Sequence, residues 1–76
     1  MARNDEITFE IVAHLGVLSS RDNGWTKEIN LVAWNGCTPK FDIRDWDADH
    51  ERMSRGVTLT EEEAHNLVKA LLAEGE

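Results

Sequence analysis

Apolar residues alternate with other residues along the first part of the chain. From residue 7 to residue 17, every odd position is apolar or small: Ile7, Phe9, Ile11, Ala13, Leu15 and Val17. A period of two is typical of a β-strand that buries one face. We therefore predict a first strand from Ile7 to Val17, in which Gly16 suits a bulge or a close backbone approach. Residues 19–24 are rich in Ser, Asp, Asn and Gly and are predicted to form a turn.

Residues 25–34 return to strand composition after that turn. Ile29, Leu31 and Ala33 share one parity, whereas Val32 and Trp34 share the other. Both sets are apolar, so the pattern leaves open which parity faces the core. Asn35-Gly36 is a favoured pair for a tight turn, and residues 37–39 lengthen the connection to the next strand.

Lys40 to Trp46 alternates more clearly and is predicted to be the third strand. Phe41 and Ile43 are expected to point toward the core. The outer face then carries two cations, a carboxylate and an indole: Lys40, Asp42, Arg44 and Trp46.

A short strand and a helix complete the pattern. Gly56 to Leu59 suits a closing strand, and Thr60 with Glu63 three residues later forms a capping box. The helix is therefore predicted to begin at about Glu61 and to end at Gly75. Apolar residues recur at helical spacing and make one face: Ala64, Leu67, Val68, Leu71 and Leu72.

Four strands followed by one helix predict an α+β fold, a four-stranded antiparallel sheet (β-β-β-β-α) with one C-terminal helix. Seventy-six residues are expected to form one domain, 1–76. One helix cannot cover such a sheet and also hide both Leu71 and Leu72. Because Cys37 is the only cysteine, an intramolecular disulfide is excluded as a further source of stability. We therefore expect a homodimer, with the apolar helix face (Ala64, Leu67, Val68, Leu71 and Leu72) at the dimer interface.

The net charge and the apolar runs limit the function classes. A formal net charge of −7 argues against a generally adhesive polycation. Residues 1–6 lack the apolar core of a signal peptide, and no run approaches the ~20 apolar residues of a membrane span. We expect a cytoplasmic protein, nucleoid-associated if bacterial, with no membrane partner.

Catalytic and metal-binding patterns are weak throughout. His14, His50 and His65 are scattered, and Cys37 has no neighbouring base in the sequence. Residues 47, 49 and 51 have calcium-loop spacing, but Arg52 and Thr58 replace the required glycine and glutamate. We therefore predict no enzyme, no metal site and no cofactor.

The outer face of the third strand suits nucleic acid instead. An indole such as Trp46 can stack on a base, which is worth ~1 to 3 kcal/mol for any base. Nearby cations could contact phosphates: Lys27, Lys40, Arg44, Arg52 and Arg55. The competing interpretation is a solvated face on which Lys40 and Arg44 pair with neighbouring carboxylates.

Two segments resemble one protein family in order and spacing. Phe41-Asp42-Ile43-Arg44-Asp45-Trp46 and Arg55-Gly56-Val57-Thr58-Leu59-Thr60-Glu61-Glu62-Glu63 are similar to the Asp-Ile-Arg strand and the helix entry of the positive-cofactor-four transcriptional coactivators. The resemblance spans roughly residues 7–72. It is strongest to the bacterial YdbC-type members, through Gly24-Trp25, Lys27-Glu28, Trp34-Asn35 and Pro39-Lys40.

The resemblance implies a homodimer of curved sheets with the helices at the interface. It also implies single-stranded DNA bound across the sheets by backbone contacts and base stacking. By position, Arg44, Trp46 and Arg55 match the family's binding residues, and Lys27, Trp34 and Lys40 extend that set.

The sequence is thus compatible with two functions. The first is single-stranded DNA binding with little sequence specificity, in transcription regulation, replication or repair, with RNA as a subordinate ligand. The second is a protein-interaction adaptor that uses the acidic helix surface or a sheet edge and binds no nucleic acid.

Overall fold

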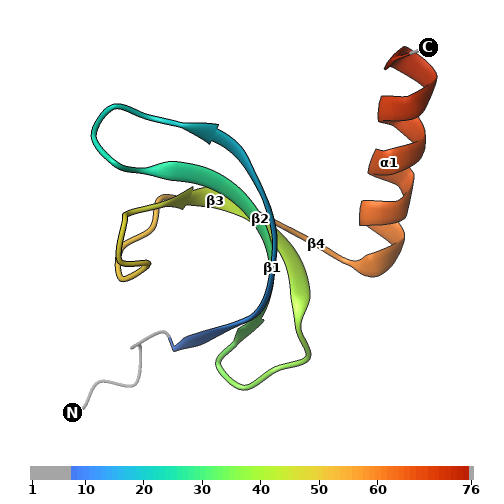
Figure 1. Ribbon diagram of the computed structural model, residues 1–76. Coiled ribbons are helices and arrows are strands. Elements are labelled where there is room, and N and C mark those ends of the chain that lie inside the picture. Colours follow the sequence, from blue (N-terminus) through green and yellow to red (C-terminus); the bar gives the residue numbers. More distant parts are fainter. Residues whose placement is uncertain (1–7, 76) are drawn as a thin grey trace.

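The computed structural model describes residues 8–75, which form one antiparallel sheet and one helix (Figure 1). The elements are β1 (Phe9–Ser20), β2 (Thr26–Trp34), β3 (Lys40–Trp46), β4 (Val57–Leu59) and α1 (Glu61–Gly75). The strands lie in the order β1-β2-β3-β4, and each pairs with the next. The predicted α+β architecture is therefore confirmed. Ile7 and the segment 1–6, for which predictions were made, lie outside the described residues.

Three bulges interrupt the pairing of β1 with β2. The register skips one residue of β1 each time, at Val12, Leu15 and Leu18. A bulge bends its strand and increases the local twist. The sheet accordingly curls strongly along β1 and β2, with a concave side facing away from α1 (Figure 1).

The bulges also change which residues of β1 share a face. Phe9 and Ile11 lie opposite Trp34 and Val32, but after the first bulge it is His14 that lies opposite Asn30. Each skipped residue reverses the parity of those that follow, so the predicted alternation over residues 7–17 is wrong at Ala13 and Leu15. Val17 lies opposite Glu28 and is back on the face of Phe9.

The register assigns each parity of β2 to a face. Glu28, Asn30, Val32 and Trp34 share the concave face with the even-numbered residues of β3, Lys40 to Trp46. Ile29, Leu31 and Ala33 lie on the convex face. Phe41 and Ile43 share that convex face, where they pair with Leu59 and Val57 of β4. This is the helix side, but Phe41 and Ile43 are only partly buried there, whereas the fully buried Val32 and Trp46 lie on the concave face. The prediction that Phe41 and Ile43 point toward the core is therefore wrong for the single chain, because the curved sheet closes around its concave side.

The turn between β2 and β3 follows the local sequence. Asn35 and Gly36 both have positive φ, 51° and 77°. Asn and Gly are the residues that adopt this backbone conformation most readily, and Asn-Gly is the preferred pair for such turns. The Asn35-Gly36 turn is confirmed.

Gly56 brings the start of β4 close to β3. A Cβ atom placed on Gly56 would lie 2.4 Å from the carbonyl oxygen of Ile43 and 2.4 Å from the Cβ atom of Arg44. No larger residue fits without movement of the β3 backbone. The Arg55-Gly56 pair therefore has a steric reason: glycine allows the chain to cross beside Arg44.

The helix begins with the predicted capping box. The amide of Thr60 donates to Oε1 of Glu63 at 2.9 Å, and the amide of Glu63 donates to Oγ1 of Thr60 at 3.1 Å. Glu61, Glu62 and Glu63 fill the first turn, where the helix dipole favours negative charge. The predicted start of the helix at Glu61 is confirmed.

α1 stands away from the convex face and approaches the sheet only near β3 and β4 (Figure 1). A groove of about 400 Å³ separates them, and it is lined mainly by Ile29, Phe41, Leu59, Leu67, Val68 and Leu71. Leu71 and Leu72 are 61% and 62% exposed. The apolar face of the helix is thus mostly uncovered in one chain. No helix within residues 8–75 is long and apolar enough to cross a membrane.

Candidate nucleic-acid interface

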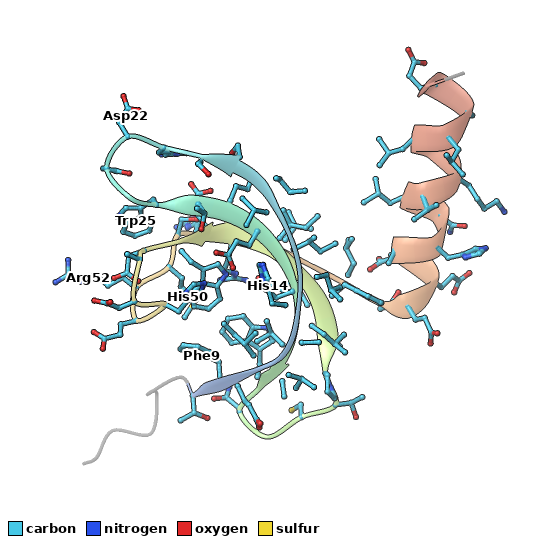
Figure 2. All side chains as sticks on the ribbon, viewed as in Figure 1. Phe9, His14, Asp22, Trp25, His50 and Arg52 are labelled. Carbon is cyan, nitrogen blue, oxygen red and sulfur yellow. The ribbon has the colours of Figure 1, made fainter. Side chains whose placement is uncertain are left out.

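An aromatic cluster lies on the concave face of the sheet. The ring centroid of Phe9 is 5.9 Å from that of Trp34 and 5.2 Å from that of Trp46. On its other side, Trp46 lies 5.6 Å from the ring of His50. Figure 2 shows Phe9, His14 and His50 on this same side, opposite the helix. Phe9 and Trp34 are partly exposed, so this cluster presents aromatic surface to solvent.

Trp46 lies on the concave face as its parity predicted, but its side chain is 0% exposed. Phe9 covers it from β1, and the loop 47–56 covers it from the other side through His50 and a bridge between Trp46 and Met53. The prediction that Trp46 presents its ring to a ligand is therefore wrong. Curvature of the sheet turns this face into the core of the single chain.

Arg44 is held by several partners on the same face. Its Nε and Nη2 atoms donate to the two carboxylate oxygens of Asp42 at 2.6 and 2.7 Å, and Nη1 donates to the carbonyl of Ser54 at 3.3 Å. Its guanidinium carbon lies 4.6 Å from the centroid of Trp34. The side chain is only 13% exposed. Of the two interpretations of this face, pairing with a carboxylate is correct for Arg44, which also packs over Trp34.

Lys27 lies on the other face of the sheet. It is opposite Asp45 in the register, and its Nζ atom is 3.6 Å from Oδ1 of that carboxylate. Arg21 approaches the second oxygen of Asp45 at 2.8 Å. The prediction that Lys27 joins Arg44 on one surface is therefore wrong. The sequence pattern had left the parity of this strand open, and the register now decides it.

Three predicted cations remain accessible. Lys40 lies on the concave face at the beginning of β3 and is exposed. Arg52 and Arg55 are exposed residues of the loop between β3 and β4, and Figure 2 shows Arg52 extending outward from that loop. Asp47 organises the loop by accepting the backbone amides of residues 51 and 52 at 2.9 and 3.1 Å. These bonds, led by that from Arg52, hold the pKa of Asp47 below its usual value.

A buried carboxylate lies between two histidines in the middle of the concave face. Glu28 is 3% exposed, and its oxygens lie 3.0 and 2.9 Å from Nε2 of His50. Nδ1 of His14 is 3.5 Å from Oε1 of Glu28 and 2.7 Å from Oδ1 of Asn30. Sequence reasoning missed this cluster because its members come from β1, β2 and a loop. A cavity of about 290 Å³ opens beside it.

The charge of Glu28 follows from these partners. Burial would raise the pKa of this carboxyl group. Hydrogen bonds from Thr26, Asn30 and His50, together with the charge that His50 can carry, outweigh burial and hold the pKa below its usual value. Glu28 therefore remains a carboxylate over the range in which histidine titrates.

No group of three or more His, Cys, Asp or Glu residues within residues 8–75 is arranged to hold a metal ion. Cys37 is a free, exposed thiol at the turn after β2.

A strongly curved antiparallel sheet with an aromatic concave face and accessible cations at its ends defines a candidate nucleic-acid-binding module. Comparison with known proteins agrees with this class. The family model described as Transcriptional Coactivator p15 (PC4) matches residues 21–70, and the chain belongs to this family. The family is non-enzymatic and is known for single-stranded DNA binding and transcriptional coactivation.

A relative is found in a spirochaete. A Treponema pallidum (strain Nichols) protein, described as uncharacterized, is 43% identical over 60 residues, which cover 79% of this chain and 71% of the relative. The narrower resemblance to YdbC-type members stays a prediction.

Proposed function

We propose that this chain binds single-stranded DNA across the concave face of its sheet, as a homodimer and with little sequence preference, in transcription regulation, replication or repair. The observation that carries the proposal is the partly exposed pair of Phe9 and Trp34, with Arg44 stacked over the indole. Family membership supports the ligand class.

Base stacking on this pair would supply much of the affinity. Every base has a π-face, so stacking contributes ~1 to 3 kcal/mol per base without reading the sequence. Phe9 and Trp34 lie opposite each other on β1 and β2, and Trp46 forms the buried floor beneath Phe9. In this proposal Trp46 supports the aromatic surface, whereas Phe9 and Trp34 contact the bases.

Phosphate contacts would come from the accessible cations Lys40, Arg52 and Arg55. Four of the chain's carboxylates lie on α1, at Glu61, Glu62, Glu63 and Glu74, which stands on the opposite side of the sheet from the concave face (Figure 1). Because these four carboxylates lie away from the concave face, they repel a strand bound there less, although the chain has a net charge of −7. Because the cations are few, stacking must matter more than in a basic protein.

The homodimer would form through the groove between α1 and the convex face. Leu67, Val68 and Leu71 line that groove from the helix, and Ala64 lies deeper at its base. Val12 and Leu15 of β1 add exposed apolar side chains. A domain of this size rarely leaves so much apolar surface exposed to water. A second copy carries the same helix and can cover it reciprocally.

Anisotropy of a labelled oligothymidine tests the proposal. The wild-type chain should bind it at low salt, and should bind duplex DNA of equal length more weakly because stacked pairs hide the base faces. Trp34→Leu should weaken binding about tenfold, since one stacked base is lost. Trp34→Phe, which keeps an aromatic ring, is the matched control and should lose less.

Absence of any oligonucleotide binding at low salt would overturn this function. It would favour the adaptor instead, which predicts co-purification with a protein through the acidic helix surface. An oligouridine of the same length should be titrated alongside the oligothymidine, because stacking by itself does not distinguish ribose from deoxyribose.

A further inference from the structure

The two histidines on either side of Glu28 have well-defined hydrogen-bond roles. Nδ2 of Asn30 donates to Oε1 of Glu28 at 3.1 Å, which leaves Oδ1 of Asn30 as an acceptor toward Nδ1 of His14. Nδ1 of His14 must therefore carry the hydrogen. In the neutral ring, Nε2 of His14 is then an acceptor.

His50 follows the same logic. Its Nε2 atom faces both oxygens of the Glu28 carboxylate and so carries the hydrogen. In the neutral ring, Nδ1 of His50 is an acceptor. Within the described residues, no protein partner occupies Nε2 of His14 or Nδ1 of His50. Both rings are also accessible, with side chains 52% and 40% exposed.

Protonation would change what these rings offer to a bound strand. An acceptor nitrogen repels the oxygens of a phosphate, whereas a protonated ring offers an N–H donor and a positive charge. We propose that His14 and His50 form a proton-dependent phosphate-binding subsite for the strand on the concave face. This inference rests on the proposed function and adds two residues and a pH dependence to it.

The surrounding charges are consistent with such a subsite. Glu28 is the only carboxylate in direct contact with the two rings among the described residues, and it attracts the protonated forms. On β3, Asp42 is neutralised by Arg44, which lies opposite Glu28 in the register. Asp47 and Arg52 belong to the same loop as His50 and carry opposite charges. The cluster therefore changes from −1 to +1 when both histidines are protonated.

A titration at two pH values tests the subsite. The probe is an oligothymidine without terminal phosphates, carrying a dye insensitive to pH, since thymine and internal phosphodiesters do not titrate in this range. Between about pH 7.5 and about pH 5.5, wild-type affinity should rise roughly three- to tenfold, as expected for two exposed charge contacts. The slope of log affinity against log salt should steepen by about 1.4, or roughly 0.7 for each added phosphate contact.

Matched variants separate these histidines from a general effect of charge. His14→Asn keeps a donor near the position of Nδ1, and His50→Gln keeps one near the position of Nε2. The double variant should lose most of the increase in affinity between pH 7.5 and pH 5.5. His65→Gln, on α1, should keep the full increase.

A second measurement needs no variant. In the wild-type chain, oligothymidine should shift the histidine ring NMR signals of His14 and His50 at pH 5.5 and leave those of His65 unchanged. An equal increase in affinity for the wild type and the double variant, or unshifted signals of His14 and His50 in the bound protein, would overturn the subsite while leaving the proposed function intact. Absence of wild-type binding at both pH values would overturn both.

Discussion

The guanidinium of Arg44 lies over the indole of Trp34, 4.6 Å from the ring centroid, while it forms two hydrogen bonds to the buried carboxylate of Asp42. The cation closest to the aromatic cluster is thus already neutralised. It fixes the position of Trp34, and both of its carboxylate-facing nitrogens are occupied. These contacts indicate that Arg44 stabilises the fold and does not bind phosphate.

Arg44→Met should strongly destabilise the fold. Asp42 is 0% exposed, and loss of its partner leaves a buried charge unpaired, which costs about 3–5 kcal/mol. A domain of this size has a total stability of similar magnitude. Urea denaturation followed by tryptophan fluorescence should therefore show a largely unfolded variant.

The double variant Asp42→Asn/Arg44→Met is the control, because it removes both charges and should recover part of the loss. If instead Arg44→Met folds normally and loses only oligonucleotide affinity, Arg44 is a direct phosphate contact and the assignment above is wrong.

Gly56→Ala should also destabilise the fold, by about 1–3 kcal/mol, as overpacking does. The new methyl group would meet the carbonyl oxygen of Ile43 at 2.4 Å, and a backbone atom of a central strand cannot move aside cheaply. Gly16→Ala is a matched control, since its methyl group would have only one atom within 4 Å, Cγ2 of Ile29 at 3.9 Å. Equal thermal stability of the two variants would contradict the close approach at Gly56.

The sequence predicted those parts of the fold that depend on local chemistry. The Asn35-Gly36 turn requires residues tolerant of positive φ, and the Thr60/Glu63 capping box requires two side chains three residues apart. The third strand could be predicted because Phe41 and Ile43 alternate with polar neighbours. Each of these features involves residues close together in the chain.

The strand register determines which residues meet in the candidate site, and local sequence patterns do not reveal that register. The bulges at Val12, Leu15 and Leu18 place Phe9 opposite Trp34 and His14 opposite Asn30. No alternation rule predicts three skipped residues in one strand. The curvature that these bulges produce buries Trp46. The sequence pattern left the parity of the second strand open, so it could not predict which face carries Lys27. Phe9 could have been identified as a site residue only once its pairing with Trp34 was known.

Glu28 should make the stability of the protein depend on acid pH. Its pKa is lower in the folded chain than the ordinary value of 4.5, so its ionised form stabilises the fold above that value. This contribution should be lost as the pH falls below about 4.5 and through the lower folded pKa. The unfolding free energies of wild type and Glu28→Gln should therefore converge between about pH 5 and pH 3. A constant difference across that range would contradict the prediction.

Leu71→Asp should disrupt the proposed dimer. Leu71 lines the groove between α1 and the convex face, and a carboxylate there would lose its hydration if a second copy covered it. Sedimentation analysis should show a monomer or an unfolded chain, and Leu72→Asp should act in the same direction. Asn66→Asp adds the same charge on the polar side of the helix and should leave the dimer intact. A normal dimer for Leu71→Asp would argue against pairing through the helix.

The salt dependence of DNA binding should be shallow at neutral pH. Three accessible cations, Lys40, Arg52 and Arg55, predict a slope of about −2 for an oligothymidine that spans one subunit, at roughly 0.7 per phosphate contact. Replacing any one of them with alanine should reduce the slope by about 0.7. Lys69→Ala, on α1, should leave it unchanged.

A steeper slope would show that other cations contact the strand. Arg21 and Lys27 would be the first to examine, since both lie beside Asp45 and could exchange that carboxylate for phosphate. Trp34→Leu should keep a slope near −2 but bind more weakly at every salt concentration. This result would separate the contribution of the phosphate contacts from that of base stacking. The cations would then set the salt response, and the aromatic pair would set the affinity that salt does not remove.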